Sequence, residues 1–121
     1  MPSHPAPTSF LPLKHDVLLI LLALGDRRLH GYGIIKEVEA RSGSEVVLQT
    51  GALYRSLKRL LSDGFIVECT APPTADSDDT RRRYYRVSPL GAAVRTAEIE
   101  RMSRIVRTAK LTPVGKRPRL A

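Results

Sequence analysis

The sequence has little of several features that mark other classes of protein. It has 121 residues, no tryptophan, 5% aromatic residues and a single cysteine, Cys69. One cysteine cannot form an intramolecular disulfide, which excludes a disulfide-stabilised secreted scaffold and suits a reducing cytosol. The longest uninterrupted apolar run, Val17 to Leu24, has eight residues, whereas a membrane-spanning helix needs about 20. The first residues also lack a signal-peptide pattern. We therefore expect a cytoplasmic protein with no membrane partner.

Catalytic and metal-binding patterns are also lacking. The three histidines, His4, His15 and His30, have no ligand spacing with Cys69 or with one another. No catalytic triad, phosphate-binding glycine loop or carboxylate pair stands in a suitable context. Nine prolines and eight glycines are too few for a low-complexity chain, and 42% hydrophobic residues are typical of one globular domain. The sequence therefore predicts a small binding module, with no enzymatic activity, metal or cofactor.

Positive charge is concentrated toward the C-terminus. The chain carries 20 Lys and Arg against 12 Asp and Glu, a formal net charge of +8. Residues 1–80 contain eight basic and ten acidic residues, whereas residues 81–121 contain twelve basic residues and only Glu98 and Glu100. A phosphate backbone rewards such a concentration through counterion release, which favours nucleic acid as the partner. A solvated basic tail, an acidic protein partner and an anionic membrane surface are the alternatives that charge alone leaves open.

The residue pattern predicts three helices, a hairpin and a fourth helix. Residues 1–12 hold four prolines and no amphipathic period, which predicts an extended, flexible segment. Asp16 is a candidate cap for the first helix and Thr50 for the third. The predicted elements are helices at 17–24, 33–40, 51–62 and 90–109, strands at 65–70 and 83–87, and a polar loop at 71–80.

This order of elements is that of a winged helix-turn-helix, a mainly α fold with a small β-hairpin. The winged-helix DNA-binding domain would span residues 13–89 and follow the flexible segment 1–12. A long C-terminal dimerisation helix would occupy residues 90–111. The basic, proline-containing tail at 112–121 is predicted to be disordered.

The third predicted helix has an apolar face and a cationic face. At about 100° per residue, one side carries Leu53, Leu57, Leu60 and Leu61. The opposite side carries Gly51, Arg55, Lys58, Arg59 and Ser62. Such a helix fits the major groove, where Arg can read guanine edges while Lys and a second Arg hold phosphates. Small residues at its start, Thr50 and Gly51, would let the helix N-terminus approach a phosphate. An ordinary solvated helix face is the alternative.

Arginines and tyrosines follow one another at the predicted hairpin. Strand alternation places Tyr85 and Val87 on the inner face, and Tyr84 and Arg86 on the other. The arginine side would meet the DNA backbone or minor groove. The acidic stretch at 76–79 either solvates a mobile loop tip or pairs with these arginines when DNA is absent. The candidate DNA-binding residues are Tyr32, Thr50, Gly51, Tyr54, Arg55, Lys58, Arg59, Arg81, Arg82, Arg83 and Arg86.

Three single residues have weaker signals. His30 is expected at a turn or helix entry. Tyr32 either packs locally or touches a phosphate. Cys69 is expected as a small buried or half-buried residue of the hairpin, with redox sensing as the alternative.

Three motifs resemble the PadR family of bacterial transcriptional regulators. Leu-His-Gly-Tyr-Gly-Ile-Ile at 29–35 is similar to the opening of that family's second helix. Thr-Gly-Ala-Leu-Tyr at 50–54, with the helix that follows, is similar to its recognition helix. Phe-Ile at 65–66 and the run at 82–91 resemble its wing and the entry to its fourth helix. The resemblance covers residues 13–91 and implies a winged-helix protein that binds DNA as a dimer and represses nearby genes.

The sequence departs from the family pattern in two respects. Arg55 stands where many members have proline, so the operator read could differ. The chain also has one C-terminal helix and resembles the short subclass, so an effector pocket formed by a larger C-terminal domain cannot be carried over. The sequence leaves open whether a small-molecule effector exists.

The C-terminal helix carries an apolar band that its own domain cannot cover fully. Over about 20 residues, or roughly 30 Å, the band outruns a three-helix core. An exposed apolar stripe of this size usually marks an interface, which predicts a homodimer. The arginines between these residues are expected on the wet side or paired with glutamates, and a helix folded back onto a monomeric core is the alternative. The candidate dimerisation residues are Leu90, Val94, Ala97, Met102, Ile105, Val106 and Ala109, with Ile99 on the flank.

These observations predict a dimeric, sequence-specific regulator, most simply a repressor, on an inverted-repeat operator in double-stranded DNA. The alternative is a module that binds nucleic acid without sequence preference, or another protein. Nucleic-acid binding would depend on salt concentration under both interpretations, so only sequence preference separates them.

Overall fold

The leucine-rich run near the N-terminus forms the central helix of the domain. A computed structural model describes residues 5–111, so the predicted tail at 112–121 lies outside the described residues. The helices are α1 (His15–Leu24), α2 (Gly31–Arg41), α3 (Thr50–Ser62) and α4 (Pro89–Leu111), with short 3-10 helices η1 (Pro7–Phe10) and η2 (Asp79–Arg81). The strands are β1 (Leu29–His30), β2 (Ile66–Cys69) and β3 (Tyr84–Val87). Within residues 5–111, no helix is long and apolar enough to cross a membrane.

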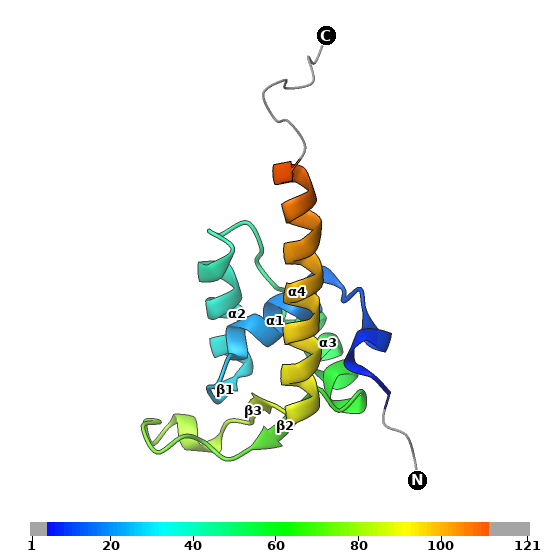
Figure 1. Ribbon diagram of the computed structural model, residues 1–121. Coiled ribbons are helices and arrows are strands. Elements are labelled where there is room, and N and C mark those ends of the chain that lie inside the picture. Colours follow the sequence, from blue (N-terminus) through cyan, green and yellow to red (C-terminus); the bar gives the residue numbers. More distant parts are fainter. Residues whose placement is uncertain (1–4, 112–121) are drawn as a thin grey trace.

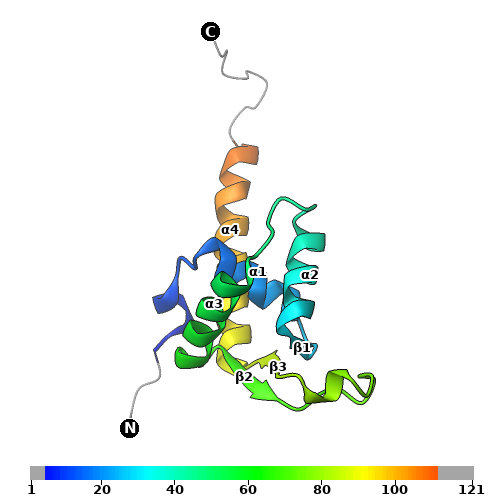
Figure 2. The same cartoon turned by 180° about the vertical axis from the view of Figure 1, so that it is seen from behind.

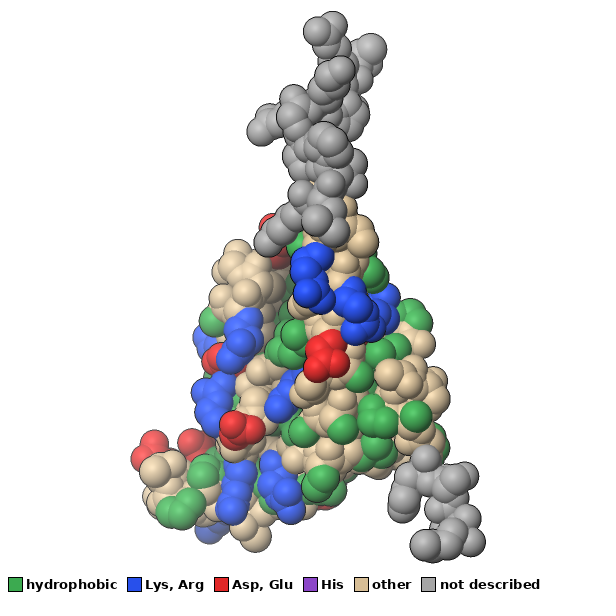
Figure 3. Space-filling model, viewed as in Figure 1, with side chains coloured by type: hydrophobic (Ala, Val, Ile, Leu, Met, Phe, Trp, Pro, Cys, Tyr) green, Lys and Arg blue, Asp and Glu red, His purple; other side chains and the backbone are tan. Residues whose placement is uncertain are grey.

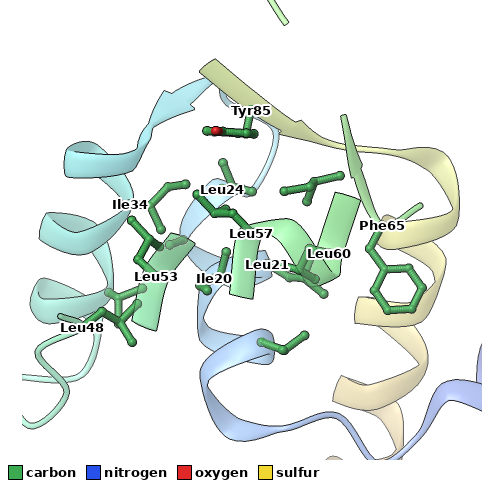
Figure 4. Packing of buried hydrophobic residues seen from close by; sticks show 14 of the residues in the cluster. Ile20, Leu21, Leu24, Ile34, Leu48, Leu53, Leu57, Leu60, Phe65 and Tyr85 are labelled. Atoms are coloured by element: carbon green, nitrogen blue, oxygen red, sulfur yellow. The ribbon is translucent and has the colours of Figure 1, made fainter. Parts of the chain in front are cut away.

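The core forms where α1 meets the inner faces of the other helices. Six of the ten residues of α1 are buried, and α1 contacts α2, α3 and α4. From α3, Leu53, Leu57 and Leu60 point into the same core, with Ile34 of α2 and Tyr85 of β3 (Figure 4). Leu61, predicted on this apolar face, is 38% exposed. It lies one residue past the buried stripe, because four leucines at these spacings span more of the helix circumference than the core covers.

The sheet has three strands rather than the two of the predicted hairpin. Its order is β1-β3-β2, with both pairs antiparallel. Leu29 lies opposite Tyr85 and His30 opposite Tyr84. A two-residue strand has no measurable period, so β1 could not be predicted from the residue pattern. The start of α2 is therefore attached directly to the wing, the hairpin formed by β2, β3 and the loop 70–83 between them.

The two predicted helix caps are wrong. Lys14 takes the N-cap position of α1 and Gln49 that of α3, neither with a side-chain cap hydrogen bond. Asp16 lies in the first turn of α1, where Oδ1 accepts from the Val17 amide at 2.9 Å. Its Oδ2 accepts from the Ser56 hydroxyl at 3.0 Å, which ties α1 to α3. The tertiary partner thus decides how Asp16 is used.

The described residues before α1 pack on the domain, contrary to the extended, flexible segment predicted for residues 1–12. Residues 1–4 of that segment lie outside the described residues. Phe10, at the end of η1, packs edge-on against Phe65 with ring centroids 4.9 Å apart. Leu11 and Leu13 also pack against the core, and η1 contacts α4. Prolines interrupt these apolar residues, so they show neither a helical nor a strand period although they supply apolar area to bury.

A buried carboxylate joins this segment to α4. Glu98 is 1% exposed, and its Oε2 accepts from the Leu13 amide at 2.6 Å. The Arg101 guanidinium donates to Glu98 Oε1. This hydrogen bond holds the pKa of Glu98 below its usual value, although burial acts in the opposite direction. The paired arginine allows a charge to be buried where sequence pattern alone would favour an apolar residue.

Helix α4 begins against the turn between α3 and β2. Ser88 Oγ donates to the Gly64 carbonyl at 2.6 Å and accepts from the Gly91 amide at 3.0 Å. Gly91 then passes so close to Phe65 that an added Cβ would lie 1.9 Å from the Phe65 carbonyl oxygen. Only glycine allows this crossing without movement of the backbone.

The two halves of α4 have different surroundings. Val94 is fully buried in the chain's own core, and Leu90 packs against that core. Val94 therefore has no free surface, contrary to its prediction as a dimerisation residue, and the half-buried Leu90 turns part of its side chain to the core instead of to a partner. Arg95, predicted on the wet side or in an ion pair, donates to the carbonyls of Leu21 and Gly25 at 3.2 Å each, at the C-terminal end of α1. The outer end of α4 extends beyond the other elements in both views (Figures 1 and 2).

Gly91→Ala should lower the free energy of unfolding by about 2–3 kcal/mol, because overpacking against backbone atoms cannot be relieved by a side-chain rotation. The measurement is urea denaturation followed by circular dichroism. Gly33→Ala is the control, since its added Cβ would meet nothing closer than 3.6 Å and alanine is the better helix former. Equal stability of Gly91→Ala and the wild type would contradict the close approach.

Candidate nucleic-acid interface

The outward face of α3 is basic and exposed to solvent. Gly51, Arg55, Lys58, Arg59 and Ser62 are all exposed, as predicted. The buried leucines on the opposite side fix the rotation of the helix about its axis. The domain therefore presents a cationic helix face to solvent.

The cations of this face have different surroundings. Arg55 extends back over the first turn, since a Cβ on Gly51 would lie 3.5 Å from its Nη1. Arg59 pairs with Asp63 one turn later, with 3.4 Å between Nε and Oδ2. Lys58 has no ion pair among residues 5–111. Arg55 also has no ion pair among these residues, so Arg55 and Lys58 are the α3 cations most available to a ligand.

A cleft lies between the starts of α2 and α3 and the wing. It has a volume of about 310 Å³ and is lined by His30, Gly31, Tyr32, Tyr54, Arg82 and Arg83. Both tyrosines expose about half of their surface, Tyr32 57% and Tyr54 52%. An added Cβ on Gly31 would lie 3.0 Å from the Tyr54 hydroxyl, so the small residue lets α3 approach α2 here. The cleft gathers four of the predicted DNA-binding side chains at one place.

His30 organises this cleft. It occupies the N-cap position of α2, as its predicted place at a helix entry implied, and its Nδ1 accepts from the Gly33 amide at 3.1 Å. Its ring stacks with Tyr32 at 6.4 Å between centroids and meets Tyr84 edge-on at 5.3 Å. Burial and the nearby Arg82 guanidinium lower the pKa of His30, while Asp79 partly opposes them. A neutral imidazole is the form that can accept the Gly33 hydrogen bond.

The wing carries its arginines outward, with one difference from the predicted alternation. Tyr85 is buried, Val87 packs against the core and Arg86 is exposed, as predicted. Tyr84, predicted on the outer face with Arg86, is only 3% exposed. It is covered because β3 is the central strand and His30 packs on it from β1, which sequence alternation could not reveal. Arg81, Arg82 and Arg83 are exposed where the loop returns to β3.

Carboxylates lie beside the wing arginines. Asp79 Oδ1 lies 3.2 Å from Arg82 Nε, which is the pairing alternative for the acidic stretch. Glu68 of β2 pairs with Arg83, with 3.6 Å between Oε1 and Nε. Asp76 and Asp78 are exposed, and acidic side chains are visible at the end of the wing loop in Figure 3. Cys69 is half-buried opposite Tyr84. Within residues 5–111, no three acidic, His or Cys side chains are grouped as a metal site.

The sequence of this chain matches a family over most of the winged-helix domain. Residues 20–97 match the transcriptional regulator PadR-like family. The chain belongs to this family. PadR-like proteins are transcriptional regulators, a class that is generally not enzymatic. No curated protein sequence matches the chain.

Solved structures show the same PadR-like winged-helix fold. A PadR family transcription regulator from hypervirulent Clostridium difficile is 24% identical with a TM-score of 0.66, covering 81% of this chain and 97% of that chain. A transcriptional regulator from Clostridium thermocellum is 23% identical with a TM-score of 0.64, covering 82% and 90%. Bacillus subtilis PadR in complex with operator DNA is 20% identical with a TM-score of 0.55, covering 74% of this chain and 47% of that chain. The described fold, with four helices and a small antiparallel sheet, is therefore a PadR-like winged helix with a long C-terminal helix.

The wild-type protein should lose stability as the pH falls from 7.5 to 5.5. The unfolded His30 side chain binds a proton near pH 6.5, while the folded form resists protonation, so acid favours the unfolded chain. His30→Asn keeps an acceptor suited to an N-cap but does not titrate. Urea denaturation at both pH values should therefore show a smaller decline for His30→Asn than for the wild type. Equal declines would contradict the role of His30 as a neutral cap.

Proposed function

We propose that this PadR-like protein is a sequence-specific repressor that binds an inverted-repeat operator as a homodimer in the cytoplasm of a bacterium. The observation that carries the proposal is the outward face of α3, where Arg55 and Lys58 stand free of ion pairs among residues 5–111. A winged helix places this face in the major groove. Arg55, in the middle of the face, would form two hydrogen bonds with a guanine edge. Lys58 and Arg59 would hold phosphates on either side.

The cleft between α2, α3 and the wing supports the same orientation on DNA. Tyr32 and Tyr54 line this cleft together with Arg82 and Arg83, and hydroxyl and guanidinium groups are common partners of phosphate oxygens. Thr50 and Gly51 would bring the N-terminus of α3 close to the backbone. Arg81 and Arg86 would extend the contact along the wing toward the minor groove.

The outer end of α4 supports the homodimer. Its apolar side chains are exposed: Ile99 and Met102 are each 42% exposed, Ile105 53% and Val106 54%. Ala97 is half-buried and Ala109 exposed on the same helix. Figure 3 shows basic side chains gathered around this part of α4 with hydrophobic ones beside them. The apolar surface would be covered by the same helix of a second copy, while the arginines remain in water.

Two-fold symmetry connects the dimer to its operator. A closed dimer repeats the same surface on both subunits, so two α3 helices would face one side of the duplex. Winged-helix and helix-turn-helix dimers place such helices about 34 Å apart, one turn of DNA. The expected operator is therefore an inverted repeat.

Binding-site selection from random duplexes tests the reading role of Arg55. The wild type should select one inverted repeat, Arg55→Ala should select a different or relaxed sequence, and Lys58→Ala should keep the wild-type sequence. Lys58→Ala should weaken binding to all duplexes and reduce the salt slope by about 1, because it removes one phosphate contact. If Arg55→Ala selects the wild-type sequence, Arg55 does not read bases in the major groove. Selection of no sequence by the wild type would favour the non-specific alternative.

Met102→Glu together with Ile105→Glu should give a monomer with much weaker operator binding, because two carboxylates would be buried in the α4 interface. Analytical ultracentrifugation measures the assembly state, and a mobility shift measures the binding. The control is Ser103→Glu with Arg107→Glu, two exposed positions outside the apolar set. A double mutant that sediments like the wild-type dimer would place the interface elsewhere.

A further inference from the structure

Three of the arginines on the proposed DNA-binding surface already hold an oxyanion in the free protein. Arg59 pairs with Asp63, Arg82 with Asp79 and Arg83 with Glu68, with Nε–oxygen distances of 3.4, 3.2 and 3.6 Å. Three different elements supply these carboxylates: the end of α3, strand β2 and the wing loop. The remaining cations of the surface have no ion pair among residues 5–111; they are Arg55, Lys58, Arg81 and Arg86.

Carboxylate and phosphate oxygens compete for the same guanidinium donors. Arg binds both through a planar fork of N–H groups. When one of these arginines turns to a DNA phosphate, its carboxylate loses a partner and stays beside a negatively charged backbone. Binding therefore replaces an intramolecular carboxylate–arginine pair with a phosphate–arginine pair instead of forming a new pair at no cost. The freed carboxylate also offsets part of the counterion release that drives binding.

Stabilisation of the fold does not explain these pairs well. All three arginines are exposed, and exposed ion pairs contribute little to stability. Asp63 is also poorly placed for its own helix, because it is the C-cap residue of α3, where the helix dipole favours a positive charge. These carboxylates offset positive charge on the surface, and the proposed DNA binding depends on that charge. Their effect on DNA binding should therefore exceed their effect on the stability of the fold.

We propose that Asp63, Glu68 and Asp79 act as internal competitors of phosphate and restrain the affinity of this protein for DNA. The inference rests on the proposed function. Arg55, Lys58, Arg81 and Arg86 bind DNA without exchange, so binding persists. Arg59, Arg82 and Arg83 engage phosphates only where the duplex offers better ligands than the neighbouring carboxylates.

The test neutralises each carboxylate in the full chain, as Asp63→Asn, Glu68→Gln and Asp79→Asn, alone and together. Affinity is measured by fluorescence anisotropy with a labelled 20-base-pair random-sequence duplex over a series of salt concentrations. Each single variant should bind about two- to fivefold more tightly, as expected from the modest strength of exposed ion pairs. The triple variant should bind about ten- to a hundredfold more tightly, and each change should steepen the salt slope by up to about 1.

The matched control is Asp78→Asn, which removes the same charge from the same loop. Asp78 is exposed and has no ion pair among residues 5–111. It should tighten binding clearly less than Asp79→Asn if exchange of the Arg82 pair is the cause. Equal effects would show that net charge alone acts, and this would overturn the proposal.

The proposed function and this inference fail differently. Unchanged affinity and salt slope in all three single variants, with a wild type that binds DNA, would overturn only the competition. A wild type that binds no duplex would contradict the proposed function itself. Glu68 is exposed and Asp79 is half-buried in the wing loop. Circular dichroism of these two single variants should show wild-type melting, so tighter binding in them is not a folding effect.

Discussion

The packing of the α3 leucine stripe against α1 is the contact on which the rest of the structure depends. Leu53, Leu57 and Leu60 are almost completely buried. Burial of a leucine stabilises by about 1.5–3 kcal/mol, so together they approach the net stability of a small domain. The same contact fixes the rotation of α3. Because the helix cannot turn about its axis without exposing these leucines, Arg55 and Lys58 must face outward.

A second set of contacts, around β3 and His30, determines the position of the wing relative to α3. The central strand β3 carries Tyr85 into the core and Tyr84 against His30, while β1 leads directly into α2. One imidazole therefore caps a helix, packs on the central strand and lies beside Arg82. The wing and the helix starts are therefore connected through side-chain contacts as well as through backbone hydrogen bonds. These contacts bring Tyr32, Tyr54 and the wing arginines to one cleft.

Helix α4 has a buried first half and an exposed second half. Its first half belongs to the core through Val94 and through the close approach of Gly91 to Phe65. Buried Glu98 marks the end of that half and binds the segment that precedes α1. Beyond this residue the apolar side chains face water. The helix is therefore packed into the core at its start and exposed at its far end, as the proposed homodimer requires.

The sequence by itself determined the order of the four α-helices and of strands β2 and β3, the leucine stripe, the outward cations of α3 and the length of α4, because these follow from periodicity and charge within one element. It also carried the motifs of the PadR-like family. Tertiary structure alone decided that Phe10 packs on Phe65, that Tyr84 is covered, that Asp16 bonds to Ser56 and that Asp79 faces Arg82. Each of these contacts joins a residue to a partner outside its own periodic element, or lies in a loop without a period. Local pattern carries no information about such partners, so only the folded chain could select them.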